Sequence, residues 1–172
     1  MTRYVMVADL RRCVGCQTCT VACRQANATP PGVQWRAVLD MEGGEYPNVT
    51  RTFVPVGCQH CSKPPCMYVC PTTATRQRDD GFVTINYDLC IGCGYCIVAC
   101  PYQARYKTLK PSYAYGNGPL AHEAARANPA RYGVATKCTF CIDRVDAGIA
   151  DSLTPGVDPA ATPACVNSCI AH

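Results

Sequence analysis

The stretch Cys90-Ile91-Gly92-Cys93-Gly94-Tyr95-Cys96-Ile97-Val98-Ala99-Cys100-Pro101 decides the fold, because two, two and three residues separate its cysteines and a proline follows them. Three thiolates spaced two residues apart on a tight loop can bind three corners of one [4Fe–4S] cube, and the fourth thiolate then completes a neighbouring cube. A zinc site needs only two C-x2-C pairs and gives the crossed fourth cysteine no role. The spacing therefore predicts iron–sulfur clusters rather than zinc.

The pattern recurs, so that the sixteen cysteines form four groups of four. The second group has spacings of two, four and three residues and is also followed by a proline, whereas 23 residues interrupt the fourth group. Three compact groups and one interrupted group make an internal repeat. In chain order, the groups are Cys13, Cys16, Cys19 and Cys23; Cys58, Cys61, Cys66 and Cys70; Cys90, Cys93, Cys96 and Cys100; and Cys138, Cys141, Cys165 and Cys169.

Apolar packing alone would barely hold this chain together. Val, Ile, Leu and Phe account for only 31 of the 172 residues, and 13 Gly and 14 Pro further dilute the helix and strand formers. Disulfide frameworks belong to secreted chains, and the start of this sequence lacks the layout of a signal peptide, so disulfides are not expected. Bound clusters are instead expected to replace part of the hydrophobic core.

Composition also limits the function. No run approaches the roughly 18 apolar residues of a membrane span, so we expect no direct span and no export by a signal of its own. The formal charge of +4 counts thiols as neutral, and sixteen thiolates on four oxidised cubes would make it −4. The arginines are scattered, so no nucleic-acid partner is expected. No catalytic motif is present, which leaves electron transfer as the predicted chemistry and no catalytic residues.

In crossed ligation, three cysteines of one group bind one cluster and the fourth binds the cluster of another group, so the groups must act in pairs. Only 19 residues join groups two and three, and within them Asp79-Asp80-Gly81 predicts a turn and 82–85 a short strand. Cys70 is therefore expected on the cluster of group three, and Cys100 on that of group two. Groups one and four must then pair across the chain. The predicted fold class is α+β, with two stacked bacterial ferredoxin-like modules of short antiparallel hairpins and short helices built around four clusters.

Other elements follow from local patterns. Tyr4–Ala8 predicts an opening strand, Val33–Asp40 and Val49–Val54 a strand pair around a turn at Gly43-Gly44, and 122–127 a helical turn. Short helices are expected after the last cysteine of each compact group. The predicted division is an outer module of 1–30 plus 131–172, an inner module of 50–107, a strand-pair insertion of 31–49, and surface insertions of 108–135 and 148–163.

Longer motifs surround the cysteines. They are Tyr4-x-Met6-x-x-Asp9-x3-Cys13-x-Gly15-Cys16, Cys58-x2-Cys61-x2-Pro64-Pro65-Cys66, Ile91-Gly92-Cys93-Gly94-Tyr95-Cys96, Cys100-Pro101-Tyr102-x-Ala104-Arg105-Tyr106 and Lys137-Cys138-Thr139-Phe140-Cys141. Over nearly the whole chain, this arrangement resembles the iron–sulfur electron-transfer subunit of the dimethyl sulfoxide reductase superfamily. The branch of quinone-linked sulfite dehydrogenase and polysulfide or thiosulfate reductase looks closest, chiefly from Asp9–Cys23 and 163–166.

The resemblance implies two partners: a large molybdenum (or tungsten) bis-pterin catalytic subunit acting on a sulfur compound, and an integral membrane anchor that reacts with quinone. It implies four [4Fe–4S] clusters, because Cys93 is present where some relatives carry a [3Fe–4S] cluster. From the catalytic subunit to the anchor, the implied ligand sets are Cys13, Cys16, Cys19 and Cys169; Cys138, Cys141, Cys165 and Cys23; Cys58, Cys61, Cys66 and Cys100; and Cys90, Cys93, Cys96 and Cys70.

Some alternatives remain open. The runner-up function is a free soluble polyferredoxin-type electron carrier. Membrane association through the partners favours the cytoplasmic face, with co-export to the periplasmic side as the alternative. His60 is expected to pack beside a cluster rather than bind iron, because sixteen cysteines already fill sixteen ligand positions. Relatives continue past the last cysteine with a strand that pairs with the opening strand, so either the chain is part of a longer product or Tyr4–Ala8 lacks its partner.

Overall fold

Three separate two-stranded antiparallel sheets, two of them hairpins, carry the strands of this protein, seen in a computed structural model that describes residues 2–171. They are β1 (Arg36–Glu45) with β2 (Asn48–Gly57), β3 (Thr75–Gln77) with β4 (Val83–Ile85), and β5 (Tyr106–Lys107) with β6 (Ala135–Thr136). The helices are α1 (Thr18–Asn27), α2 (Pro65–Tyr68), α3 (Tyr95–Val98), α4 (Ala121–Arg126), the 3₁₀ turn η1 (Pro129–Arg131), α5 (Ile142–Ala150) and α6 (Ala164–Asn167). The predicted α+β class with short antiparallel hairpins is confirmed.

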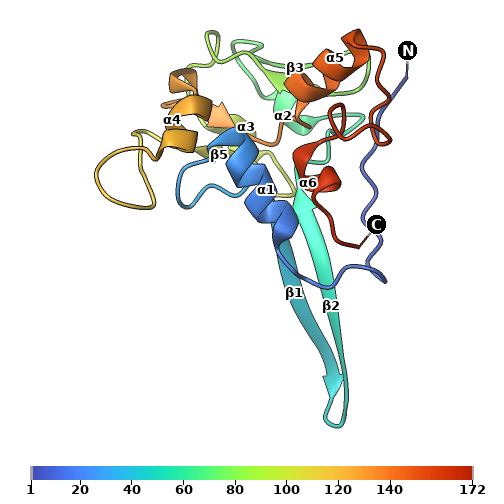
Figure 1. The fold of residues 1–172 in the computed structure, drawn as a ribbon. Helices are drawn as coiled ribbons and strands as arrows, with labels where there is room; N and C mark the ends of the chain where they lie inside the picture. Colours follow the sequence, from blue (N-terminus) through green and yellow to red (C-terminus); the bar gives the residue numbers. More distant parts are fainter. Residues whose placement is uncertain (1, 172) are drawn as a thin grey trace.

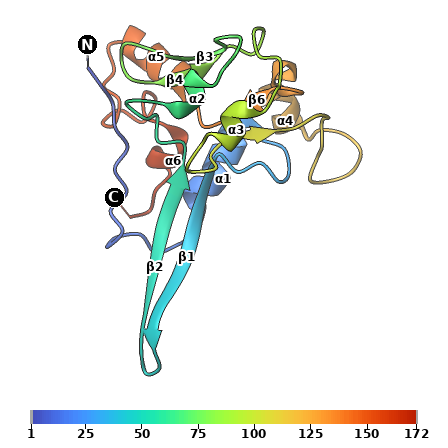
Figure 2. The same cartoon turned by 180° about the vertical axis from the view of Figure 1, so that it is seen from behind.

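The β1–β2 hairpin extends away from the rest of the molecule as a long arm (Figures 1 and 2). Its ten pairs run from Arg36 opposite Gly57 to Glu45 opposite Asn48, so Tyr46 and Pro47 form the turn. The hairpin was predicted, but the turn at Gly43-Gly44 was wrong. Gly44 instead lies in the last but one pair of the ladder, opposite Val49. Its φ is +92°, and a Cβ there would clash with the backbone oxygen of Asn48, so the position favours glycine although it is not in the turn.

The short helices begin earlier than expected. In α1, α2, α3 and α6 the second helical residue is the third cysteine of its group: Cys19, Cys66, Cys96 and Cys165. The prediction that helices follow the last cysteine was therefore wrong. After α2, α3 and α6 the last cysteine comes directly after the C-cap residue, so each four-residue helix carries the chain from one thiolate position to the next.

The opening strand was also predicted wrongly, because residues 4–8 have no regular secondary structure and pair with no strand among residues 2–171. The segment is held by side chains instead. Tyr4 stacks on Phe82 with ring centroids 6.0 Å apart, and Arg3 donates a hydrogen bond to Ser62 Oγ at 2.9 Å. The helical turn expected at 122–127 is confirmed as α4, within a largely exposed insertion.

Two small clusters of the buried core contain cysteines, which make up half of their buried members. One holds Cys23, Val33, Trp35 and Cys165, and the other holds Cys66, Val83, Cys96 and Ala135. The first cluster is formed where α1 packs against α6, elements from opposite ends of the described chain that lie side by side in Figure 1. Thiol side chains thus occupy positions that Leu or Ile would hold in an ordinary small domain.

Candidate iron–sulfur centres

A first cavity of about 270 Å³ gathers cysteines from both ends of the chain. Cys13, Cys16 and Cys19 approach it from the loop before α1 and from the start of α1, and Cys169 approaches from the residues after α6. Cys165 lies in the same wall. The structure therefore brings together the four residues of the first expected ligand set.

A second cavity of about 380 Å³ is lined by Cys138, Cys141, Cys165 and Cys23, the second expected set. Burial first, and then the neighbouring thiolates of Cys138, Cys165 and Cys141, strongly raise the pKa of Cys23. Burial likewise raises the pKa of Cys138 to about 11. Thiolates crowded into a buried cavity require positive charge beside them, and the irons of a cluster supply that charge.

The second cavity continues to the inner cysteine groups, because Cys58 and Cys61 also line it. Burial raises the pKa of Cys61, and the nearby thiolates of Cys58 and Cys100 raise it further. This proximity relates Cys100 to the second group, as crossed ligation requires. In the third group, Cys90 packs against the buried cluster that holds Cys96, whereas Cys93 is exposed.

His60 provides a separate indication that the second cavity suits a sulfur-rich group. The side chain is 8% exposed, and its Nδ1 accepts a hydrogen bond from the Val83 backbone N–H at 3.0 Å. Nε2 therefore carries the proton, yet it makes no well-formed hydrogen bond. Burial, with the charges of Lys137 and Arg105, lowers the pKa of His60 to about 3, so the ring stays neutral. A cluster sulfur beside Nε2–H would accept this unused hydrogen bond.

Two buried cations, Lys137 and Arg105, were not identified as functional from the sequence. Lys137 is 2% exposed and Arg105 3% exposed. Arg105 Nη2 donates to Cys66 Sγ at 3.0 Å, and Lys137 Nζ donates to the backbone oxygens of Cys138, at 2.9 Å, and Val83. Both residues belong to the motifs that surround the cysteines. Their burial could not be predicted from the sequence, because Lys and Arg side chains are normally exposed.

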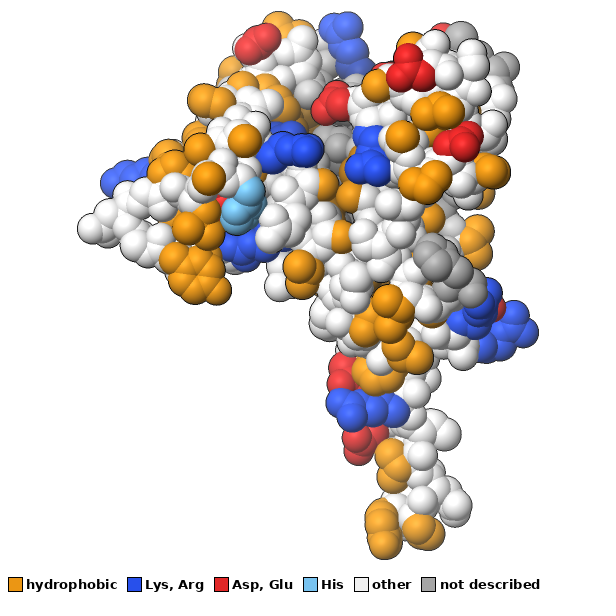
Figure 3. Space-filling model, in the orientation of Figure 1, with side chains coloured by type: hydrophobic (Ala, Val, Ile, Leu, Met, Phe, Trp, Pro, Cys, Tyr) orange, Lys and Arg blue, Asp and Glu red, His pale blue; other side chains and the backbone are white. Residues whose placement is uncertain are grey.

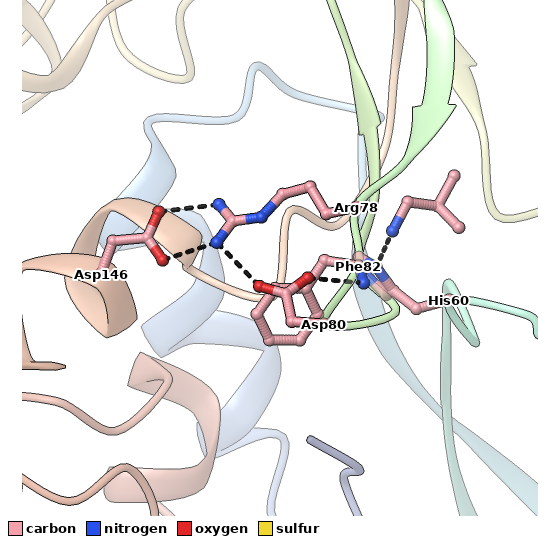
Figure 4. Close-up of polar contacts among 6 residues, drawn as sticks. His60, Arg78, Asp80, Phe82 and Asp146 are labelled. Atoms are coloured by element: carbon pink, nitrogen blue, oxygen red, sulfur yellow. Dashed lines mark hydrogen bonds and ion pairs between the residues drawn. The ribbon is translucent and has the colours of Figure 1, made fainter. Parts of the chain in front are cut away.

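Figure 4 shows the polar contacts that connect the β3–β4 turn to α5. Arg78 Nη1 and Nη2 donate to the two carboxylate oxygens of Asp146 at 2.7 and 2.9 Å, and Nη2 also pairs with Asp80 at 2.7 Å. Beside them, Phe82 packs edge-on to His60, with ring centroids 5.8 Å apart, and lies 4.6 Å from the ring of Phe140. His60 and Phe140 line the second cavity, and Phe82 packs against both rings.

The donor set and the cavities fit clusters rather than a disulfide framework. None of the sixteen cysteines forms a disulfide. Within residues 2–171, no three Cys, His, Asp or Glu side chains lie close enough together to hold a single metal ion. A cubane places each thiolate on a different iron, so its ligands surround a larger volume than those of one ion.

Comparison with known proteins gives the same chemistry. Residues 49–114 match the family model described as a 4Fe-4S dicluster domain. A selenate reductase subunit of Mesobacillus selenatarsenatis is 44% identical over 86% of this chain and 54% of its own length. A tetrathionate reductase subunit of Salmonella typhimurium is 40% identical over 98% and 55%, and the thiosulfate reductase electron transfer subunit PhsB of Salmonella typhi is 38% identical over 97% and 71%.

The chain thus spans somewhat more than half the length of the selenate and tetrathionate reductase subunits that it matches. The predicted cofactor class is confirmed, and the protein binds [4Fe–4S] clusters through its cysteines. The pairing of individual cysteines into ligand sets stays a prediction.

Proposed function

We propose a function for this chain from its family: it belongs to the iron–sulfur subunits of the dimethyl sulfoxide reductase superfamily. Subunits of this kind are not the catalytic subunits of their complexes. We infer that the chain relays electrons between a molybdenum (or tungsten) bis-pterin catalytic subunit, acting on a sulfur compound or a similar oxyanion, and a quinone-reactive membrane anchor. When bound, the clusters supply one-electron transfer.

The observation that carries this proposal is the meeting of distant cysteines in two adjoining cavities. The first cavity joins Cys13 to Cys169, and the second extends from Cys23 to Cys58. Cys165 lines both cavities, so the two sites are neighbours. Sites in contact through the protein interior form a path, which a relay requires.

We propose four ligand sets in two ferredoxin-like modules, as the spacing predicts. The backbone places the third cysteine of each group at the second position of a helix, and the rings of His60 and Phe140 form part of the wall of the second cavity. The proposed sets are Cys13, Cys16, Cys19 and Cys169; Cys138, Cys141, Cys165 and Cys23; Cys58, Cys61, Cys66 and Cys100; and Cys90, Cys93, Cys96 and Cys70.

The anchor is proposed to dock where the inner module exposes apolar side chains. Cys93 is exposed, and around it in sequence Ile91, Tyr95 and Val98 are 68%, 62% and 89% exposed. Patches of this kind on a soluble domain mark interaction sites. No helix within residues 2–171 is long and apolar enough to cross a membrane. We propose membrane association through the anchor, with the cytoplasmic face favoured and the periplasmic side, reached by co-export, as the alternative.

The arm formed by β1 and β2 is proposed to contact the catalytic subunit. Its root adjoins the first cavity, since Pro55 lines that cavity and Phe53 packs so closely on Gly15 that a Cβ there would clash with the ring. Figure 3 shows hydrophobic side chains at the end of the arm. Tyr46, in the turn, is 92% exposed, and Met41, midway along the ladder, is 56% exposed. A protein that exchanges electrons at the first cavity would meet these side chains.

Isolation of the protein from native membranes under anaerobic conditions tests the proposal. A complex that contains a catalytic subunit and a membrane subunit is expected, with about sixteen iron and sixteen sulfide per copy of this chain, as four cubes require. A lone soluble species with the same iron content would instead support the free electron carrier.

A further inference from the structure

Lys137 carries the deepest charge in the described part of the chain. It follows β6, and its Nζ joins two backbone oxygens from different parts of the fold: Cys138, in the fourth cysteine group, and Val83 in β4 of the inner hairpin. Only 2% of the residue is exposed, and no carboxylate within residues 2–171 pairs with it. An ammonium buried in this way requires negative charge from another source.

Cysteine thiolates are a source of negative charge close to Lys137. Its Nζ donates to the backbone oxygen of Cys138, the next residue in the chain, and Cys138 and Cys58 line the second cavity. An oxidised cube with four thiolates carries a net charge of −2, because its core is +2, and reduction adds one further negative charge. A fixed cation at this position thus faces the sites whose charge changes during electron transfer.

Arg105 adds a second fixed charge on the inner side of the same boundary. Its Nη2 donates to Cys66 Sγ at 3.0 Å, and its Nη1 donates to Thr75 Oγ1 at 3.1 Å. Thr75 starts β3, the strand that pairs with β4, on which Lys137 Nζ rests. Lys137 and Arg105 therefore both donate hydrogen bonds to the β3–β4 hairpin, Lys137 to Val83 and Arg105 to Thr75. Cys66 of the inner groups and Cys138 of the fourth group lie beside these contacts.

We propose that Lys137 and Arg105 raise the reduction potentials of the two middle clusters, those of Cys138, Cys141, Cys165 and Cys23 and of Cys58, Cys61, Cys66 and Cys100. The inference rests on the ligand sets given under the proposed function. The mechanism is electrostatic: inside the protein, a cation stabilises the extra electron of a reduced cluster far more than it would in water. An electron at the boundary between the modules is thereby more stable than it would be without the two cations.

A structural role is the rival explanation, because the Lys137 side chain also connects β4, at Val83, to the start of the fourth cysteine group at Cys138. The two roles differ in what a charge-preserving substitution does. Lys137→Arg keeps the charge but changes the hydrogen-bond geometry, whereas Lys137→Met keeps the approximate length and removes the charge. Lys110→Met, at an exposed lysine in the insertion after β5, is the matched control.

The test is a dithionite titration of the full chain followed by electron paramagnetic resonance, with iron and sulfide measured for every variant. The midpoint potentials of the clusters can be measured on the iron-loaded chain with or without its partners, and the parent and the variants are compared in the same state. In Lys137→Met, two of the midpoint potentials should fall by an amount equal to at least a tenfold loss in the reduction equilibrium, which is about 59 mV for one electron. Lys137→Arg should retain the original potentials, and Lys110→Met should change none.

Unchanged potentials in a fully loaded Lys137→Met protein would overturn the proposal and leave Lys137 a structural tie. Should that variant fail to load iron, Arg105→Gln serves instead, since it keeps a donor for Cys66 Sγ and removes the charge. One potential should then fall, and none falling would equally overturn the proposal. A failed complex isolation with these shifts intact would count against the proposed function but not against the role of the two cations.

Discussion

Arg78 reaches from the β3–β4 turn to Asp146 on α5, and the two side chains form a bidentate ion pair with hydrogen bonds of 2.7 and 2.9 Å (Figure 4). The pair joins a segment between the second and third cysteine groups to a helix within the fourth. It therefore connects the inner and outer cysteine groups through side chains alone.

Asp146→Asn is expected to lower the free energy of unfolding by about 0.5 kcal/mol, a modest value because both partners are partly exposed and Asp80 remains to pair with Arg78. The hydrogen bond from Arg78 lowers the pKa of Asp146 below 3.8. The stabilisation of the folded protein by this ion pair is thus fully present above pH 3.8, and it is lost only as the pH falls through the lower pKa that Asp146 has in the folded state. Between pH 5 and 8 the loss should be constant, and it should shrink in 1 M salt.

Anaerobic thermal unfolding of the parent and Asp146→Asn proteins across this pH range provides the measurement, with Asp151→Asn on the exposed end of the same helix as control. A difference that disappears between pH 8 and pH 5 would show that Asp146 titrates in that window and that the pair is not formed as described.

Crossed ligation predicts which cysteine substitutions act on the same cluster. Cys169→Ser should alter the same paramagnetic signal as Cys16→Ser, because both residues line the first cavity. Cys23→Ser should alter the signal changed by Cys141→Ser, although Cys23 belongs to the first group in sequence. Spectra in which Cys23→Ser and Cys16→Ser change one shared signal would contradict the crossed arrangement.

Cys93→Ser is expected to separate two activities of the assembled complex. Loss of a ligand at the exposed end of the inner module should abolish quinone-linked turnover, whereas turnover with a dye that reaches the catalytic subunit directly should largely remain. Both rates are measured on the same membrane preparation, with the subunit content checked by gel. Equal loss of the two activities in an intact complex would place Cys93 away from the quinone end.

The arm predicts a variant that retains its clusters but does not assemble. Replacing Glu42–Arg51 by Asn-Gly leaves Met41 opposite Thr52 and supplies a two-residue hairpin turn. Iron content should stay normal, because the removed residues are exposed and belong to neither buried cluster. Co-purification with the catalytic subunit should fall at least tenfold, whereas Tyr46→Ser alone should cause a smaller loss. Normal assembly of the shortened protein would refute docking through the arm.

Removal of the clusters should unfold most of the chain. Cysteines make up half of the buried members of the two core clusters, so the free energy of cluster binding takes the place of part of the ordinary apolar packing. Protein treated with a chelator and a reductant should show no cooperative thermal transition by circular dichroism. A sharp transition in that sample would mean that Trp35, Val83 and their neighbours suffice for folding.

The sequence predicts the chemistry well because cluster ligation depends on local spacing, and local spacing is fully visible at Cys90–Cys100. It predicts the β1–β2 hairpin but misplaces its turn, because Gly43-Gly44 has stronger turn chemistry than Tyr46-Pro47. Tyr4–Ala8 has the residue pattern of a strand, but a strand forms only where another strand pairs with it, and the pattern does not show whether one does. The buried positions of Lys137 and His60 follow from contacts between distant segments, which no local pattern contains.

The packing of α1 on α6 also has a consequence for how the protein is made. Ala28 to Pro163, 136 residues, separate the two helices. At a synthesis rate of roughly 5–20 residues per second, the ribosome needs about 7–27 s to add them. The second and third cysteine groups have both been made once residue 100 emerges, but Cys13, Cys16, Cys19 and Cys23 line cavities whose walls also need Cys165 and, in the first cavity, Cys169. During nascent-chain growth, the cysteines made first are therefore the last to be enclosed, and they are the ones most exposed to oxidation before iron arrives.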